Sequence, residues 1–152
     1  MSDLEKKIQS DLVKSMKVRD EVRLSTLRML KSEIQKVKTA KGSSHELADE
    51  DISCLVQRSI KQRREAAEQY LAGGASDRAD EELAEADILK EYLLLQLSSE
   101  ELDAVIADVA DQLHSTGPGD MGRLMGKVMS LLKGKADGFV VQKKVSDFLS
   151  KM

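Results

Sequence analysis

Apolar residues recur every three or four positions along most of the chain, which is the spacing of one buried face of an α-helix. The β-branched residues are scattered singly instead of alternating with polar ones, and the chain has one proline, so strands are not indicated. Aromatic residues are rare, and Leu, Val, Ile, Ala and Met supply the apolar content. The sequence therefore predicts an all-α fold of packed amphipathic helices.

Capping signals and glycines divide the chain into seven predicted helices. Ser2 with Glu5, and Ser98 with Glu101, have the pattern of a capping box, in which a hydroxyl and a carboxylate each satisfy a free backbone N–H. The other predicted helix starts are Asp49, Ser76 or Asp77, about Asp120, and Asp137. Turns are predicted around residues 41–44, 73–74 and 116–119, and at Gly134.

The second capping box also marks a predicted domain boundary, because Leu97 and Leu102 are placed there as a hydrophobic staple. We predict an N-terminal helical domain over residues 1–94 and a compact three-helix domain over residues 97–152. The first helix is predicted to bury Leu4, Ile8, Leu12 and Met16. The last is predicted to bury Val140, Val141, Val145, Phe148 and Leu149.

Several classes of protein are excluded or disfavoured by composition. A single cysteine, Cys54, permits neither an intramolecular disulfide nor a Cys-rich metal cluster, and suits a reducing cytoplasm. No secretory signal and no apolar run of membrane-spanning length is found, so we expect a cytoplasmic protein without a membrane partner. The two histidines, His45 and His114, lack metal-ligand spacing and a partner for nucleophilic catalysis. We predict no catalytic residue, metal site or cofactor.

Charge is segregated along the chain. Residues 1–41 carry eleven Lys and Arg against six Asp and Glu, and residues 117–152 carry seven against three. Residues 71–116 carry two against twelve. The two basic ends fit a polyanion such as RNA, but acidic and basic segments that neutralise each other within the fold explain the pattern equally well.

The sixth predicted helix contains two glycines, Gly122 and Gly126, which share one side with Met129. Arg123 and Lys127 lie just beyond them, and Lys133 and Lys135 follow. Each glycine costs a helix about 1 kcal/mol relative to alanine, so a compensating role is expected. Close packing of a neighbouring helix on the bare backbone is the interpretation that spacing favours. The alternative is close approach of an RNA sugar-phosphate chain, with the four cations around it.

Arg63 lies within the apolar stripe of the third predicted helix. An unpaired buried guanidinium costs several kcal/mol. We therefore predict a structural ion pair between Arg63 and Glu82 or Glu85 across a helical hairpin. The alternative for Arg63 is an RNA contact.

The stretch Gly122-Arg123-Leu124-Met125-Gly126-Lys127-Val128-Met129, followed by Gly134-Lys135-Ala136-Asp137, resembles the tail domain of the GatB subunit of glutamine-dependent tRNA amidotransferases. It is still more similar to the free-standing YqeY proteins, which have Asp in the last position. The similarity to this GatB/YqeY family extends over nearly the whole chain. The other matching residues are Arg23-Leu24, Leu27-Arg28, Lys61-Gln62-Arg63, Gly73-Gly74, Glu82, Glu85, Tyr92-Leu93, Leu97-Ser98 and Glu101-Leu102. The chain departs from the family pattern at Leu94, where Pro is common, and at Ala75, where Arg is common.

The resemblance implies that this tail grips tRNA while catalysis occurs in other domains. We therefore expect a non-catalytic tRNA-binding module that contacts no DNA. Its expected RNA- or partner-binding residues are Gly122, Arg123, Gly126, Lys127, Met129, Lys133 and Lys135. An alternative is a protein–protein adaptor for an aminoacyl-tRNA synthetase or amidotransferase subunit. A weaker alternative is an accessory role in amide transfer from glutamine, in which a partner subunit supplies the nucleophile and the nucleotide site.

Overall fold

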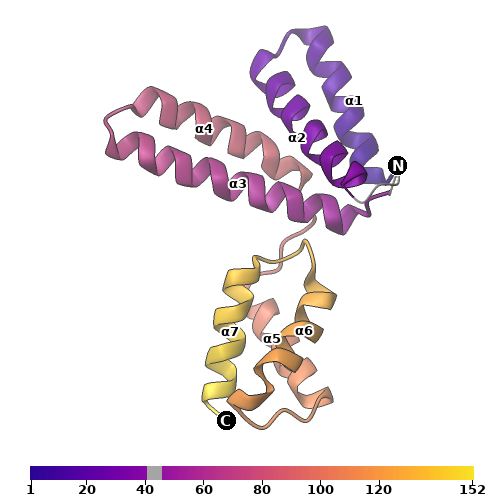
Figure 1. Cartoon of the computed structure of the whole chain (residues 1–152), viewed down its shortest axis with the longest axis vertical. Helices are drawn as coiled ribbons and strands as arrows, with labels where there is room; N and C mark the ends of the chain where they lie inside the picture. Colours follow the sequence, from indigo (N-terminus) through magenta and orange to yellow (C-terminus); the bar gives the residue numbers. More distant parts are fainter. Residues whose placement is uncertain (41–45) are drawn as a thin grey trace. The chain divides into compact units, whose positions relative to one another are not determined.

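The computed structural model describes residues 1–40 and 46–152, and within these ranges it contains seven α-helices and no strand (Figure 1). This confirms the predicted all-α fold. The predicted turn at residues 41–44 and His45 lie outside the described residues. The helices are α1 (Asp3–Val18), α2 (Glu21–Thr39), α3 (Asp49–Ala72), α4 (Ser76–Leu89), α5 (Ser99–Gln112), α6 (Met121–Leu132) and α7 (Gly138–Ser150). Contacts divide the chain into two compact units, Met1–Leu94 and Leu95–Met152.

Two helical hairpins build the N-terminal unit, one from α1 and α2 and the other from α3 and α4 (Figure 1). Their apolar faces share one core, which contains Ile8, Leu12, Leu27, Leu30, Ile34, Ile52, Val56, Ile60, Ala86 and Leu89. Met16, which was predicted to face this core, is half exposed at 50%. The inward position at this end of α1 is Ser15, which is 1% exposed, so the neighbouring Met16 lies off the buried face.

Tyr92 closes the N-terminal unit from a short 3-10 turn, Lys90–Tyr92, that follows α4. Its ring is fully buried, and its hydroxyl donates a hydrogen bond of 2.7 Å to the carboxylate of Asp11 on α1. Burial raises the pKa of Tyr92 well above its ordinary value, and the bond to Asp11 acts in the same direction. The ammonium of Lys7 lies 5.2 Å from the ring centroid and donates to the Glu91 carbonyl. The end of this unit is thus bonded to its first helix.

Three helix starts differ from the prediction, and at two of them, α1 and α3, the polar side chain forms a tertiary contact instead. At α1, the Ser2 hydroxyl accepts the N–H of Glu5, but the Glu5 carboxylate pairs with Lys38 of α2 instead of completing a capping box. At α3, the N-cap is Ala48. The carboxylate of Asp49 accepts the N–H of Leu4 from α1. Helix α4 follows Ala75, which provides no side-chain cap.

The C-terminal unit is a bundle of α5, α6 and α7 around its own core (Figure 1). Ser98 and Glu101 form the predicted capping box at α5, with hydrogen bonds of 3.1 and 3.3 Å. The predicted staple residues Leu97 and Leu102 both pack in the core. The buried core residues are Leu102, Ile106, Val109, Ala110, Leu124, Val128, Leu132, Ala136, Val141, Val145 and Leu149. No described helix is both long and apolar enough to cross a membrane.

Candidate nucleic-acid interface

Helix α6 has a buried face and a bare face. Leu124, Val128 and Leu132 are buried in the C-terminal core, whereas Gly122 and Gly126 are exposed. A Cβ atom added at either glycine would meet no heavy atom within 4 Å in the described part of the molecule, apart from its own helix. Contrary to the packing interpretation that spacing favoured, no neighbouring helix within the C-terminal unit covers this backbone.

Arg123 lies beside the two exposed glycines, and its side chain also contacts the turn between α5 and α6. Its side chain is 58% exposed. One Nη atom donates a hydrogen bond of 2.6 Å to the carbonyl of Leu113 at the end of α5, and lies 3.5 Å from the Asp120 carboxylate. The N–H of Thr116 donates to the same carboxylate and lowers its pKa, and the charge of Arg123 acts in the same direction. The guanidinium has five donors, so these contacts leave others for a ligand.

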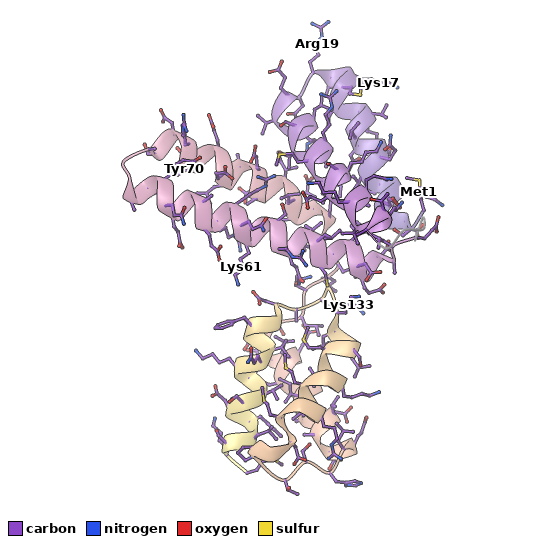
Figure 2. All side chains as sticks on the ribbon, viewed as in Figure 1. Met1, Lys17, Arg19, Lys61, Tyr70 and Lys133 are labelled. Atoms are coloured by element: carbon purple, nitrogen blue, oxygen red, sulfur yellow. The ribbon has the colours of Figure 1, made fainter. Side chains whose placement is uncertain are left out.

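The other predicted cations differ in how they are held. Lys127 is exposed and has no ion-pair partner among residues 1–40 and 46–152. Lys133 is exposed just past the end of α6, where Figure 2 labels it. Lys135 is half-buried, and its backbone is fixed by hydrogen bonds with Leu132 and Leu97. The structure thus places two exposed lysines and one partly exposed lysine along α6 and the loop that follows it.

Met129 takes a different position from the one expected. Its side chain is half-buried against the C-terminal core, and its Cε atom lies 3.7 Å from the place where a Cβ of Gly138 would stand. Met129 therefore packs between α6 and α7. The bare face consists instead of Gly122, Gly126 and, one turn further, Ser130.

The chemistry available at this face is recognition of an anionic chain. Exposed helical backbone lets a ligand approach closely, and Arg123 and Lys127 stand about 100° further around the helix to meet negative charge. Within the described ranges, no three His, Cys, Asp or Glu residues are grouped so that they could hold a metal ion.

Arg63 lies in the N-terminal unit, and the structure brings it together with both expected carboxylates. Its Nη1 atom lies 2.9 Å from Oε2 of Glu85 and 3.6 Å from Oε2 of Glu82. The other terminal nitrogen lies 3.6 Å from the sulfur of Met29. The Arg63 side chain is 11% exposed, and its buried Nε atom has no acceptor among the described residues. This geometry links α3 and α4 and leaves little of Arg63 for RNA.

Glu85 gives the N-terminal unit a predicted pH dependence. Burial raises its pKa above the ordinary 4.5; Arg63 opposes this rise, while Glu82 and Glu81 add to it. The folded state therefore binds this proton more tightly than the unfolded state, and the contribution of Glu85 to stability falls as pH rises from about 4.5 through the folded pKa. We expect the free energy of unfolding of Glu85→Gln, relative to the unmodified protein, to increase over that pH range in urea titrations. The exposed replacement Glu68→Gln should show no such trend, and a flat difference for Glu85→Gln would contradict the pKa shift.

One exposed residue was not found from the sequence. Phe139, in the first turn of α7, is 68% exposed. Val140, which was predicted to face inward, is 41% exposed, whereas Val141, Val145 and Leu149 are buried. The spacing of apolar residues could have revealed this. Positions 141, 145 and 149 define the inward face of α7, and Phe139 lies on the opposite side of the helix.

Fold and surface together define a small all-helical protein of two units, one of which exposes a cationic helix face. The sequence model described as "Yqey-like protein" matches residues 5–149, and the chain belongs to that family. This confirms the resemblance to the GatB/YqeY proteins.

Similar proteins carry two kinds of name. "Altered inheritance of mitochondria protein 41, mitochondrial" from Pyrenophora tritici-repentis is 27% identical over 144 residues, which cover 93% of this chain and 78% of that protein. The protein of the same name from Lachancea thermotolerans is 32% identical over 73% of this chain and 60% of its own length. A subunit of the glutamyl-tRNA(Gln) amidotransferase from Thermococcus gammatolerans is 34% identical over 51% of this chain, which corresponds to 15% of that larger protein. The chain is thus distantly related to the amidotransferases, and spans only a small part of the archaeal protein.

Proposed function

We propose that this protein is a non-catalytic RNA-binding module that holds tRNA along the bare face of α6. The observation that carries the proposal is the open backbone at Gly122 and Gly126 beside the exposed cations Arg123 and Lys127. The name of the related amidotransferase refers to tRNA, and this similarity supports tRNA as the ligand. The single cysteine, Cys54, is half-buried and free, which suits the reducing cytoplasm that we propose as the location.

In this proposal the glycines and the cations have separate roles. The glycines let a sugar-phosphate chain lie directly on the helix, and the cations contact phosphates and release counterions from the RNA. Binding should therefore weaken steeply as salt concentration increases. Specificity would come from the shape of the RNA, because phosphate contacts carry no sequence information.

Alanine at Gly122 and Gly126 should separate stability from binding. A Cβ at either position meets nothing, so each replacement should stabilise the C-terminal unit by about 0.5–1 kcal/mol by removing a helical glycine. The same methyl groups would lie between the helix and the RNA, so we expect the affinity for tRNA to fall. Urea unfolding and fluorescence anisotropy with labelled tRNA measure the two effects.

Gly119→Ala is the matched control, because it adds the same methyl group into open space in the turn that precedes α6. We expect it to leave tRNA affinity unchanged. If the two α6 variants gain stability and bind tRNA as tightly as the unmodified protein, the bare face is not the binding site. If the unmodified protein does not bind tRNA even at low salt, the proposed function is wrong.

A second candidate function is a protein adaptor, for which the row of small exposed residues at Gly122, Gly126 and Ser130 is the specific observation. Leu131, on the same helix, is 49% exposed. A helix of an aminoacyl-tRNA synthetase or amidotransferase subunit could pack against such a surface. This binding would depend weakly on salt, and a pull-down would return a stoichiometric protein in place of RNA. Amide transfer remains the weakest candidate, and glutaminase activity of the isolated chain would be the result that favours it.

A further inference from the structure

The aromatic residues of this chain have very different exposures. All four lie in the described ranges: Tyr92 is fully buried, Tyr70 and Phe148 are partly buried, and Phe139 is 68% exposed. Phe148 packs against the C-terminal core, and the Tyr70 ring lies 5.9 Å from the guanidinium carbon of Arg78. Phe139 is therefore the only aromatic ring in the described structure that presents most of its surface to solvent.

Hydrogen bonds fix the loop that leads into α7, in whose first turn Phe139 lies. The N–H of Leu97 donates to the carbonyl of Lys135 at 3.0 Å, and the side-chain amide of Gln96 donates to the carbonyl of Gly134 at 2.9 Å. The Asp137 carboxylate accepts the N–H of Phe139 at 2.8 Å. The backbone around Phe139 is thus already ordered, so less conformational entropy is lost when a ligand binds there.

Lysines lie close to Phe139 in the sequence, both before it and after it. Lys143 is exposed four residues after Phe139, and this spacing places both side chains on the same face of α7. Lys133 and Lys135 lie in the loop before it. The nearest acidic side chain in sequence, Asp137, is occupied as the N-cap of α7. Residues 117–152 as a whole carry seven Lys and Arg against three Asp and Glu, so the surroundings favour an anionic partner.

We infer that Phe139 stacks on an unpaired base of the bound RNA, while Lys135 and Lys143 contact the phosphates on either side of that base. This inference rests on the proposed function and extends the RNA-binding surface from α6 to the first turn of α7. An exposed ring with a lysine four residues before it and another four residues after it matches a nucleotide, because the ring can stack on the base and the lysines can contact the phosphates.

Replacements at Phe139 test the inference with tRNA as the probe. Phe139→Ala should weaken tRNA binding about tenfold, since stacking on an aromatic ring contributes about 1–3 kcal/mol per base. Phe139→Leu should weaken it about as much, because leucine is apolar but offers no ring face. Phe139→Tyr keeps the ring and should keep the affinity. Because the side chain is exposed, all three proteins should fold, and circular dichroism melting checks this.

A fluorescence experiment observes stacking directly. The chain contains no tryptophan, so Phe139→Trp introduces a single indole reporter. An adenine oligoribonucleotide should quench this indole, whereas inorganic polyphosphate, which has charge but no bases, should bind without quenching it. Phe139→Ala should also bind polyphosphate as tightly as the unmodified protein, because its cations are intact.

The outcomes separate the inference from the proposed function. If Phe139→Leu binds tRNA as tightly as the unmodified protein, or if the oligoribonucleotide binds without quenching the indole, stacking is excluded although RNA binding stands. Weaker tRNA binding by Phe139→Ala together with full retention by Phe139→Leu would show that Phe139 makes a simple apolar contact and does not stack. If the unmodified protein does not bind tRNA even at low salt, the proposed function itself fails and the inference fails with it.

Discussion

Replacing Arg63 with alanine is expected to destabilise the protein by about 3–5 kcal/mol. The Arg63 guanidinium is buried between α3 and α4, and it is the ion-pair partner of both Glu82 and Glu85. Its loss leaves two carboxylates, each less than a quarter exposed, without a compensating charge. Because such a penalty is a large part of the stability of a typical domain, we expect the midpoint of urea unfolding to shift strongly.

Arg64→Ala provides the matched control, since Arg64 is the next residue on α3 and is exposed. We expect its free energy of unfolding to change by no more than about 0.5 kcal/mol. Adding Glu82→Gln and Glu85→Gln to Arg63→Ala should recover much of the lost stability, because the uncompensated charges are then removed. If Arg63→Ala is as stable as Arg64→Ala, the cluster contributes nothing to the fold and Arg63 becomes available for another role.

Reversing the charge of Lys127 and Lys135 together, with Lys127→Glu and Lys135→Glu, is expected to weaken tRNA binding by roughly 100-fold at moderate salt. Each replacement removes one phosphate contact and introduces repulsion. The dependence of log affinity on log salt concentration should also become shallower, by about one for each lysine lost. Filter binding or anisotropy over a series of salt concentrations measures both effects.

The control variant carries Lys31→Glu and Arg64→Glu, which make the same change in net charge at exposed positions of α2 and α3. This pair should change tRNA affinity far less, because those side chains lie outside the proposed surface. Equal losses from both pairs would show that tRNA responds to overall charge alone. Because Lys135 is half-buried, unfolding curves must also show that the double variant keeps its fold.

Features that depend on local sequence could be predicted, because the interactions that determine them lie within one turn. The capping box of Ser98 and Glu101 is an example, since its two hydrogen bonds connect residues three apart. The capping box at Ser2 was only half right, because Glu5 pairs with Lys38, thirty-three residues away on α2. Asp49 likewise bonds to Leu4 instead of capping its own helix. Tertiary contacts of this kind leave no periodic signal in the sequence.

The candidate site was predictable only in part, for the same reason. The glycines and cations of α6 could be placed on one side of the helix from their spacing, but whether another helix covers that side depends on the whole bundle. Met129 shares that side on an ideal helix, yet its flexible side chain reaches the space above Gly138 on α7. The predicted inward face of α7 was too wide, because it included Val140 as well as Val141, and the exposed Phe139 on the opposite side was not singled out.

The position of Tyr92 has a consequence for the order in which the chain folds. Its bond to Asp11 joins residues 81 positions apart, and the bond of Lys7 to the Glu91 carbonyl spans 84. The two hairpins can form early from local contacts, but the contacts that lock α1 against the end of α4 require almost the whole unit to have left the ribosome. During synthesis, therefore, the N-terminal helices must wait for residues 91 and 92 before their assembly is complete.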